Sequence, residues 1–310
     1  MTPGYEALTN TCALVDLSAR GRIRVEGDDR ARLLHAMTTN HVQQMKPGDG
    51  LYAFFLNPQG RILADVCIFC FEDHYLLDTE PATRQTIYDH LDHFIIADDV
   101  TLTDVTAQTF CFGIEGPKAT EVAGRAGIPA PHHRFSHARA GEYTVASLSS
   151  TGSQGVRLFG SAAHKNEAIR LIEGAGAIFA SEADAEAARV ENFVPRYGCD
   201  ITESTLPQET QQVHALHYQK GCYIGQEIVE RIRSRGHVNK LLMGFRSQGT
   251  TVPEPGAKLQ LEGKPTGEVT SATVANGVVF GLAYVRVPGA RSGAMAEIDG
   301  HAVELFAPRA

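Results

Sequence analysis

The spacing of hydrophobic and polar positions changes several times along this chain, and each change predicts a different element. Residues 51–56 and 61–71 alternate apolar and polar positions around a turn that contains Gly60, and 75–78 continue in the same way. This alternation is typical of antiparallel strands. Helical spacing is found at 81–94, 117–126, 163–173 and 183–193. From Lys240 onward, a small antiparallel β-barrel is predicted by short apolar runs between Gly and Pro turns, at 241–246, 257–261, 267–274, 278–285 and 297–306.

One local pattern occurs twice. Residues 22–31 predict a short strand, a glycine turn at Gly27 and the start of a helix, and residues 111–119 repeat this plan with Gly116 at the turn. Pro117 stands where the first helical residue of the second copy is expected. The repetition indicates two related α+β modules that face each other.

Length and charge exclude several classes of protein. The 310 residues suggest two or three domains, and the net charge of -8 provides no general attraction for nucleic acid or an anionic membrane. No run of 18 apolar residues occurs, so we expect no transmembrane helix. Residues 1–6 have neither a basic region nor an Arg-rich amphipathic pattern, and we therefore expect a cytoplasmic protein.

The six cysteines, at positions 12, 67, 70, 111, 199 and 222, are widely scattered. Such spacing indicates a reducing compartment rather than a disulfide framework. Cys67 and Cys70 have the spacing of a metal motif but lie in an apolar strand, where residues three apart face opposite sides of the sheet. We expect both to be buried, and we expect no permanent metal ion.

The segment from Lys220 to Gly236 is polar, glycine-flanked and built around Cys222. After Gly225 the spacing becomes helical, and Gly236 is placed to end the helix in a left-handed conformation. Cys222 thus precedes a helix N-terminus with Lys220 close by, a setting that favours the thiolate. The alternative is that Cys222 is a buried small hydrophobe.

A thiol nucleophile also needs a base within hydrogen-bond reach. His214, His217 and His237 are near Cys222 in the sequence, which leaves a thiol hydrolase or transferase open. The remaining histidine patterns show no metal-ligand spacing, and we expect His132-His133 and His214-x-x-His217 to lie on the surface.

The segment resembles the signature of the YgfZ family, folate-binding relatives of the glycine cleavage T-protein that support iron–sulfur proteins. The positions that match this signature are Lys220, Gly221, Cys222, Tyr223, Gly225, Gln226, Glu227, Arg231, Arg235 and Gly236. Further similarity is found at 16–18, 23–30, 39–40, 55–63, 189–191, 195–198 and 206–209. The sequence around Asp65 is similar to the mitochondrial-type branch of the family, which acts late in [4Fe–4S] assembly.

The resemblance implies an α+β fold, a three-lobed T-protein-like ring around a central folate channel. Two interleaved α+β modules are expected over 1–239, with an inner boundary near 105–116, and the C-terminal antiparallel β-barrel is expected over 240–310. The implied cofactor is tetrahydrofolate. The implied partners are folate itself and iron–sulfur carrier or client proteins, without nucleic acid or membrane.

Particular residues take up roles under this resemblance. Glu191 occupies the position that holds the pterin ring, which one buried carboxylate can bind in bidentate fashion. The folate site is expected to include Glu191, Asp65, Tyr223, Arg231 and Arg235. Arg231, Arg233 or Arg235 is expected to meet the carboxylates of the folate tail, with a solvated position favoured for Arg233.

One departure from the T-protein concerns catalysis. The T-protein has an Asp-Asp pair whose first member assists aminomethyl transfer, and the aligned pair here is Ala64-Asp65. Neighbouring strand residues face opposite sides, so we expect Asp65 not to replace the missing carboxylate. The sequence therefore favours a folate-binding protein that assists [4Fe–4S] assembly or repair through Cys222. A folate-dependent aminomethyltransferase or another one-carbon transferase is the alternative, and whether the chain is an enzyme stays open.

Overall fold

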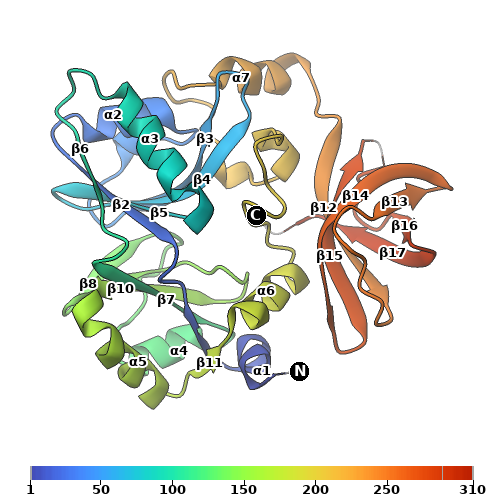
Figure 1. The fold of residues 1–310 in the computed structure, drawn as a ribbon, viewed down its shortest axis with the longest axis horizontal. Helices are drawn as coiled ribbons and strands as arrows, with labels where there is room; N and C mark the ends of the chain where they lie inside the picture. Colours follow the sequence, from blue (N-terminus) through green and yellow to red (C-terminus); the bar gives the residue numbers. More distant parts are fainter. Residues whose placement is uncertain (1, 288, 309–310) are drawn as a thin grey trace.

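The computed structural model describes residues 2–287 and 289–308, which form two open β-sheets and a closed barrel. The first sheet has the strand order β3-β4-β5-β2-β6 and the second β11-β1-β7-β10-β9-β8. The barrel, β12-β15-β14-β13-β16-β17, stands to one side of both sheets (Figure 1). The expected three-lobed α+β fold with a C-terminal antiparallel barrel is thus confirmed.

The strands have the following bounds. The first sheet contains β2 (Gly21–Glu26), β3 (Gly50–Leu56), β4 (Ile62–Cys70), β5 (His74–Thr79) and β6 (Thr101–Asp104). The second contains β1 (Ala13–Asp16), β7 (Thr109–Glu115), β8 (His137–Ala140), β9 (Tyr143–Ala146), β10 (Gly155–Ser161) and β11 (Ile178–Ala180). The barrel contains β12 (Lys240–Gln248), β13 (Lys258–Leu261), β14 (Lys264–Ala275), β15 (Val278–Arg286), β16 (Met295–Ile298) and β17 (His301–Phe306).

The helices other than α1 lie close to the predicted segments. They are α1 (Pro3–Asn10), α2 (Arg30–Met37), α3 (Arg84–Phe94), α4 (Ala119–Arg125), α5 (Lys165–Gly174), α6 (Glu182–Glu191) and α7 (Gln226–Arg235), with short 3₁₀ turns between them. Two details of the prediction are wrong. Helix α4 begins two residues after Pro117, and Gly236 ends α7 with an extended φ of -127° instead of a left-handed one. No helix within 2–287 and 289–308 is long and apolar enough to cross a bilayer.

The first and second sheets are interleaved in the chain. Strand β1 pairs with β7 in antiparallel fashion and with β11 in parallel fashion, although β2–β6 intervene in the sequence. The predicted repeat is confirmed, since β2 leads through Gly27 to α2 and β7 leads through Gly116 to α4. Both glycines have positive φ, 101° and 128°, and a Cβ at Gly27 would stand 2.0 Å from the Asp99 carbonyl oxygen. Only glycine fits this turn.

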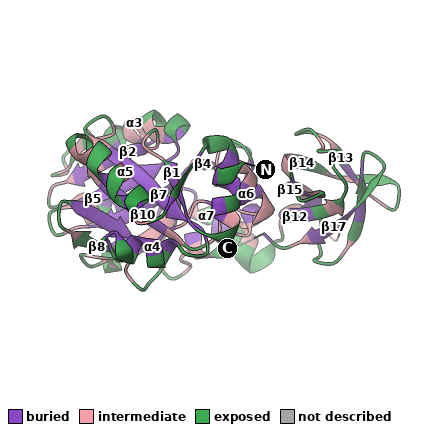
Figure 2. Ribbon diagram, turned by 90° about the horizontal axis from the view of Figure 1, so that it is seen from below, coloured by how far each residue is buried: buried purple, intermediate pink, exposed green. Residues whose placement is uncertain are grey.

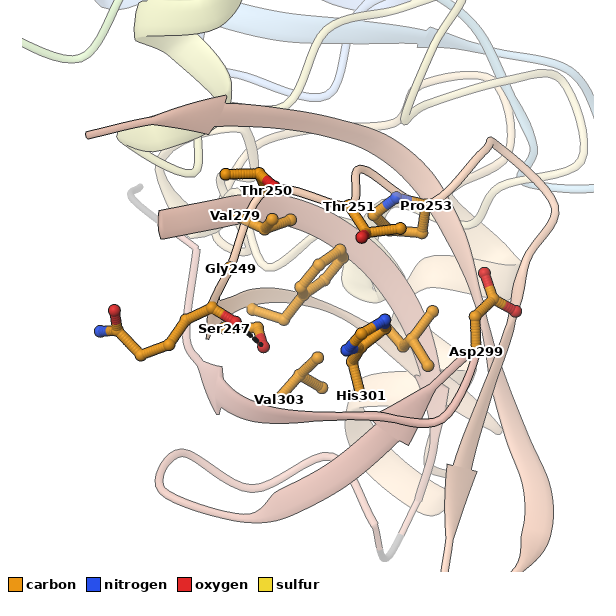
Figure 3. A pocket seen from close by; sticks show the side chains of 12 residues that line it. Ser247, Gly249, Thr250, Thr251, Pro253, Val279, Asp299, His301 and Val303 are labelled. Atoms are coloured by element: carbon orange, nitrogen blue, oxygen red, sulfur yellow. Dashed lines mark hydrogen bonds between the residues drawn. The ribbon is translucent and has the colours of Figure 1, made fainter. Parts of the chain in front are cut away.

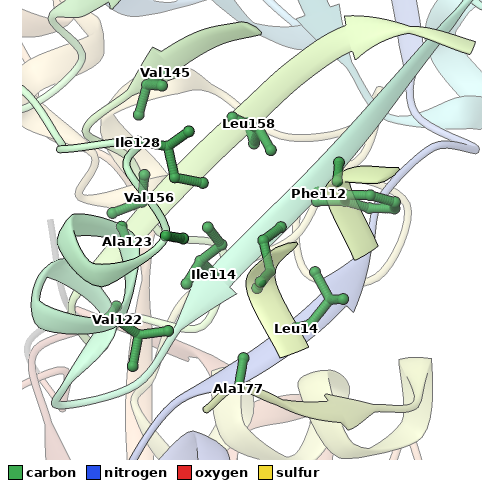
Figure 4. Close-up of a cluster of buried hydrophobic side chains, with 14 of the residues drawn as sticks. Leu14, Phe112, Ile114, Val122, Ala123, Ile128, Val145, Val156, Leu158 and Ala177 are labelled. Atoms are coloured by element: carbon green, nitrogen blue, oxygen red, sulfur yellow. The ribbon is translucent and has the colours of Figure 1, made fainter. Parts of the chain in front are cut away.

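Each layer has its own apolar core. Figure 4 shows the cluster between the second sheet and its helices, where Leu14, Phe112, Ile114 and Leu158 meet Val122 of α4. In the first sheet, Cys70 faces the helix-covered core, whereas Cys67 faces the other side of β4. The sequence prediction that these two sulfurs lie on opposite faces is confirmed.

The barrel is attached to α6 through buried polar contacts. Arg189 of α6 donates to the Asp200 carboxylate at 2.6 Å and to the Ser271 hydroxyl of β14 at 3.0 Å. Ser271 and Thr270 both donate to the other Asp200 oxygen, at 2.7 and 2.5 Å. Arg189, Asp200 and Ser271 are all buried, while much of the outer barrel surface is exposed (Figure 2). Asp200 therefore joins α6, its own loop and the barrel.

Candidate functional site

A charged cavity of about 210 Å³ lies between the two open sheets, α6 and the segment 194–214. Its polar lining includes Asp16, Arg20, Tyr52, Asp65, Glu80, Arg134, Arg157, Glu182, Glu186, Arg189, Arg196 and His214. A smaller hollow of about 80 Å³ opens in the barrel between Phe245, Val279 and His301 (Figure 3). The larger cavity gathers far more ionisable groups and is the candidate ligand site.

A chain of buried ion pairs forms one wall of this cavity. Arg157 Nη1 lies 2.5 Å from Asp78 Oδ2, and Arg20 Nε lies 2.8 Å from Asp78 Oδ1. Arg20 also pairs with Glu80, which lies 3.0 Å from Arg196 Nε. Burial acts to raise the pKa of Asp78, but Arg20 and Arg157 lower it overall. The alternating charges compensate one another and fix the wall.

Asp65 points into this cavity. Its Oδ2 accepts a hydrogen bond of 2.9 Å from the Tyr52 hydroxyl, and its Oδ1 is buried without a partner. Burial, and then the charge of Glu80, raise the pKa of Asp65 to about 6. Ala64 instead belongs to the core on the other face of β4. Our expectation that Asp65 does not replace the missing carboxylate is therefore not supported by the geometry, because Asp65 itself is the cavity-facing member of the pair.

His214 forms an aromatic wall together with Tyr52 and Phe135. Its ring centroid lies 5.2 Å from that of Tyr52 and 5.8 Å from that of Phe135, nearly parallel to the latter at 24°. The Nδ1 atom is buried and unpartnered, and burial, reinforced by Arg134, lowers the pKa of His214 to about 4. The prediction of a surface position for His214 is wrong, and no local pattern in the sequence signals its place in the cavity.

Glu191 lies away from the cavity. The helical positions of Glu182, Glu186 and Arg189 share one face of α6 and line the cavity, whereas Glu191 is about half a turn away from that face. Its carboxylate accepts a hydrogen bond of 2.5 Å from the Tyr5 hydroxyl. The pterin role of Glu191 stays a prediction, but the cavity offers it no support. Glu186, which sequence reasoning missed, is the α6 carboxylate beside the cavity that pairs with Arg189.

Cys222 is exposed on a loop that is anchored outside the cavity. Lys220 Nζ donates to the carbonyl oxygens of His35 and Thr38 at the end of α2. The Ile224 amide donates to the Ala36 carbonyl at 3.2 Å. Burial lowers the pKa of Lys220 to about 7. These contacts hold both sides of the Cys222 loop. Because Cys222 itself is exposed, the alternative that it is a buried small hydrophobe is wrong.

The other signature residues have structural positions around α7. Tyr223 is buried beneath Lys220, whose Nζ lies 4.6 Å from the ring centroid, and its amide donates to the Gln226 side chain at 3.2 Å. Gly225 has a φ of 82°, and a Cβ there would lie 2.7 Å from the Asn57 carbonyl oxygen. The signature glycine is thus required by the close contact between α7 and the β3–β4 turn.

The predicted folate-tail arginines are exposed on α7. Arg231 and Arg235 do not line the cavity, and Arg233 stacks over Tyr218 at 4.4 Å. The arginines that do line it are Arg20, Arg134, Arg157, Arg189 and Arg196. Of the predicted folate residues, the structure therefore places only Asp65 in the cavity. The roles of Tyr223, Arg231 and Arg235 stay predictions.

Comparison with known proteins places this architecture in a family. The model of the GCVT N-terminal domain matches residues 3–220. The chain belongs to this family. Among proteins of similar sequence, an aminomethyltransferase of Rubrobacter xylanophilus is 29% identical to this chain, over 91% of this chain and 78% of its own length. A chloroplastic protein of Arabidopsis thaliana that carries the name of a transferase is 29% identical over 93% of this chain and 68% of its own.

A solved structure supports the fold of this GCVT-family chain. The glycine cleavage system aminomethyltransferase T from Bartonella henselae superposes with a TM-score of 0.88 over 98% of this chain and 87% of that one, at 20% identity. The cavity between the sheets and the Cys222 loop are therefore two separate places on a family scaffold. Because folds of one family host different activities, the site residues decide the function.

Proposed function

We propose that this protein binds tetrahydrofolate in the central cavity and assists the assembly or repair of [4Fe–4S] clusters in client enzymes, with Cys222 as its functional thiol. The observation that carries the proposal is the position of Cys222, exposed on an anchored loop outside the cavity. A thiol so placed is presented to another macromolecule. Thiolate is a suitable ligand for iron, and a single one requires a partner to complete the site.

Two features of the cavity support a folate ligand. Tyr52, Phe135 and His214 offer aromatic surface to a flat ring. Asp65 Oδ1 and His214 Nδ1 are buried polar atoms without partners, so a ligand with ring N–H and acceptor groups would satisfy both. At about 210 Å³ the cavity suits a ring system, with a charged tail extending toward solvent.

The test is a binding titration of the purified protein with tetrahydrofolate. Asp65→Asn keeps the shape but loses the carboxylate, and it should weaken binding by roughly tenfold, or about 1.4 kcal/mol. Glu191→Gln measures the pterin role predicted for Glu191, and Arg235→Gln measures the role predicted for the α7 arginines. Absence of binding by the wild-type protein would remove folate from the proposal.

Aminomethyl transfer is the second candidate, and the orientation of Asp65 favours it. A carboxyl group with a pKa of about 6 can hold or release a proton near neutral pH, which suits it to general acid–base chemistry. Incubation with tetrahydrofolate and a methylamine-loaded carrier protein distinguishes the two candidates. Product formation that is lost in Asp65→Asn and retained in Cys222→Ser would establish the transferase.

A further inference from the structure

The aromatic wall of the central cavity leads from Asp65 to an arginine. The Asp65 carboxylate accepts a hydrogen bond from the Tyr52 hydroxyl, and the ring centroid of Tyr52 lies 5.2 Å from that of His214. The His214 ring stacks on that of Phe135 at 5.8 Å, and the Arg134 guanidinium lies 4.8 Å from the centroid of the Phe135 ring. All of these residues line the cavity. Consecutive contacts thus connect a carboxyl group, across three rings, with a guanidinium.

Arg134 lies where the cavity opens to solvent. The residue lines the cavity and is nevertheless exposed, whereas Asp65 and Phe135 are each only 8% exposed. Partial burial lowers the pKa of Arg134, so a bound anion would stabilise its charged form. The remaining arginines of the cavity are held by carboxylates of the protein itself, and they are Arg20, Arg157, Arg189 and Arg196. A ligand anion can therefore reach the Arg134 guanidinium from solvent without displacing those ion pairs.

The backbone next to Arg134 is strained and held in place. Phe135 has a φ of 65°, which a residue with a bulky side chain rarely adopts. Its amide donates to the Ser147 carbonyl at 2.8 Å, and its carbonyl oxygen would lie 2.2 Å from a Cβ at Gly50. Only a glycine in β3 lets the two backbones come this close. Strain that the surroundings enforce is concentrated at ligand sites, and here it fixes the ring over which the guanidinium lies.

We propose that Arg134 is the specificity-determining residue for the anionic end of the ligand, so that the cavity selects a hydrogen-bonding ring with a carboxylate tail over the same ring without one. The inference rests on the proposed function, in which tetrahydrofolate is such a ligand. The ring lies against Tyr52 and His214 with its N–H donors at Asp65. The tail carboxylate accepts two hydrogen bonds from the planar guanidinium.

The test compares two ligands on the full chain. Wild-type protein is titrated with tetrahydrofolate and with 6-methyltetrahydropterin, which has the same ring but no benzoyl-glutamate tail. We expect tetrahydrofolate to bind at least about tenfold more tightly, a difference of about 1.4 kcal/mol. Arg134→Gln should weaken tetrahydrofolate binding about tenfold and change the affinity for the tailless pterin less than about twofold. Arg134→Lys keeps the charge but loses the planar fork, and its tetrahydrofolate affinity should fall between those of wild type and Arg134→Gln.

Three controls separate recognition of the tail from a structural effect. Arg139→Gln removes an exposed arginine of β8 that does not line the cavity, and both affinities should stay as in wild type. Arg134→Gln should melt within about 2 °C of wild type, because exposed side chains contribute little to stability. Added salt should weaken tetrahydrofolate binding by wild type more than by Arg134→Gln, since salt screens an exposed ion pair.

The outcomes distinguish the role of Arg134 from folate binding itself. Equal losses for both ligands in Arg134→Gln, or an unchanged affinity for tetrahydrofolate, would overturn the role of Arg134 and leave folate binding in place. If Arg235→Gln weakened tetrahydrofolate binding and Arg134→Gln did not, the tail would belong to α7 instead. A wild-type protein that bound neither ligand would remove folate from the proposed function, and the tail site with it.

Discussion

The Tyr52 hydroxyl donates to Asp65 Oδ2 at 2.9 Å, while the other oxygen of this carboxylate is buried without a partner. Burial and the nearby Glu80 make the charged form of Asp65 costly. The same carboxylate faces the space where a ligand would lie. Its protonation state therefore links the stability of the fold to the chemistry of the cavity.

Asp65→Asn should change how stability depends on pH. The pKa of Asp65 in the folded protein, about 6, lies above its unfolded value of 3.8, so the folded state binds the proton more tightly. The wild-type free energy of unfolding should then fall as pH rises from about 4 to 6, by on the order of 1–3 kcal/mol. Asn cannot ionise, and the variant should lose this slope. Urea denaturation at a series of pH values measures it.

Tyr52→Phe is the companion variant for that measurement. Loss of the hydroxyl removes a hydrogen bond that stabilises the Asp65 carboxylate, so the fall in stability with rising pH should become steeper. A flatter curve for Tyr52→Phe would show that the cause of the pKa shift has been assigned wrongly.

Asp78→Asn should be strongly destabilising. It leaves Arg157, only 3% exposed, without its counter-charge and removes one of the two carboxylates that hold Arg20. The expected loss is about 3–5 kcal/mol at neutral pH. Because the pKa of Asp78 is lowered, its contribution is present above pH 3.8 and is lost as pH falls through the folded value. Chemical denaturation gives the free energy.

Glu268→Gln is the matched control for a surface pair. Lys258 and Glu268 lie 2.5 Å apart on the barrel, but their side chains are 59% and 56% exposed. Breaking this pair should change the free energy of unfolding by less than about 1 kcal/mol. If Glu268→Gln and Asp78→Asn lost the same free energy of unfolding, burial would not determine how much an ion pair stabilises this protein.

Gly225→Ala should destabilise the start of α7 by roughly 2 kcal/mol or more. Alanine is strained at a φ of 82°, and its Cβ would approach the Asn57 carbonyl oxygen to 2.7 Å. Gly124→Ala on α4 is the control, because nothing lies within 4 Å of the added Cβ and alanine favours helix by up to about 1 kcal/mol. Thermal melting of both variants should show shifts of opposite sign.

Cys222→Ser should separate the function of the Cys222 loop from folate binding in the central cavity. Folate affinity should change less than about threefold, or 0.7 kcal/mol, because Cys222 does not line the cavity. Stability should stay within about 0.5 kcal/mol, since the side chain is exposed. Rescue of [4Fe–4S] enzyme activity in cells that lack the protein should fall to the empty-vector level. Full rescue by the serine variant would show that Cys222 performs no chemistry.

The sequence predicts the parts of this fold that rest on local periodicity. Alternation predicts the β3–β4 hairpin, and helical spacing after Gly225 predicts α7. The orientation of Asp65 was not predictable from a motif alone, because alternation states that Ala64 and Asp65 differ in face but not which face meets the cavity. The register settles this, with Asp65 opposite Phe54 and Ala64 opposite Phe55.

Functional positions made by distant segments were out of reach of the sequence. The rings of His41 and His217 are in contact, with centroids 5.0 Å apart, because the segment around 217–220 folds back on the end of α2, where the carbonyl oxygens of His35 and Thr38 hold Lys220. The position of Glu191 relative to the cavity has a local reason, since its place on α6 is about half a turn from the face that borders the cavity, and its pterin role stays a prediction. A motif match identifies a residue, but it does not tell which way the side chain of that residue points.

The Asp200 junction has a mechanical consequence. One carboxylate holds Arg189 of α6 and two hydroxyls of the barrel, so the barrel cannot swing outward without breaking the buried hydrogen bonds that Ser271 and Thr270 make to Asp200 and Arg189. Because α6 is a wall of the cavity, the barrel acts as a brace for that wall. A partner protein that bound the barrel and shifted it would therefore also displace α6 and change the shape of the cavity.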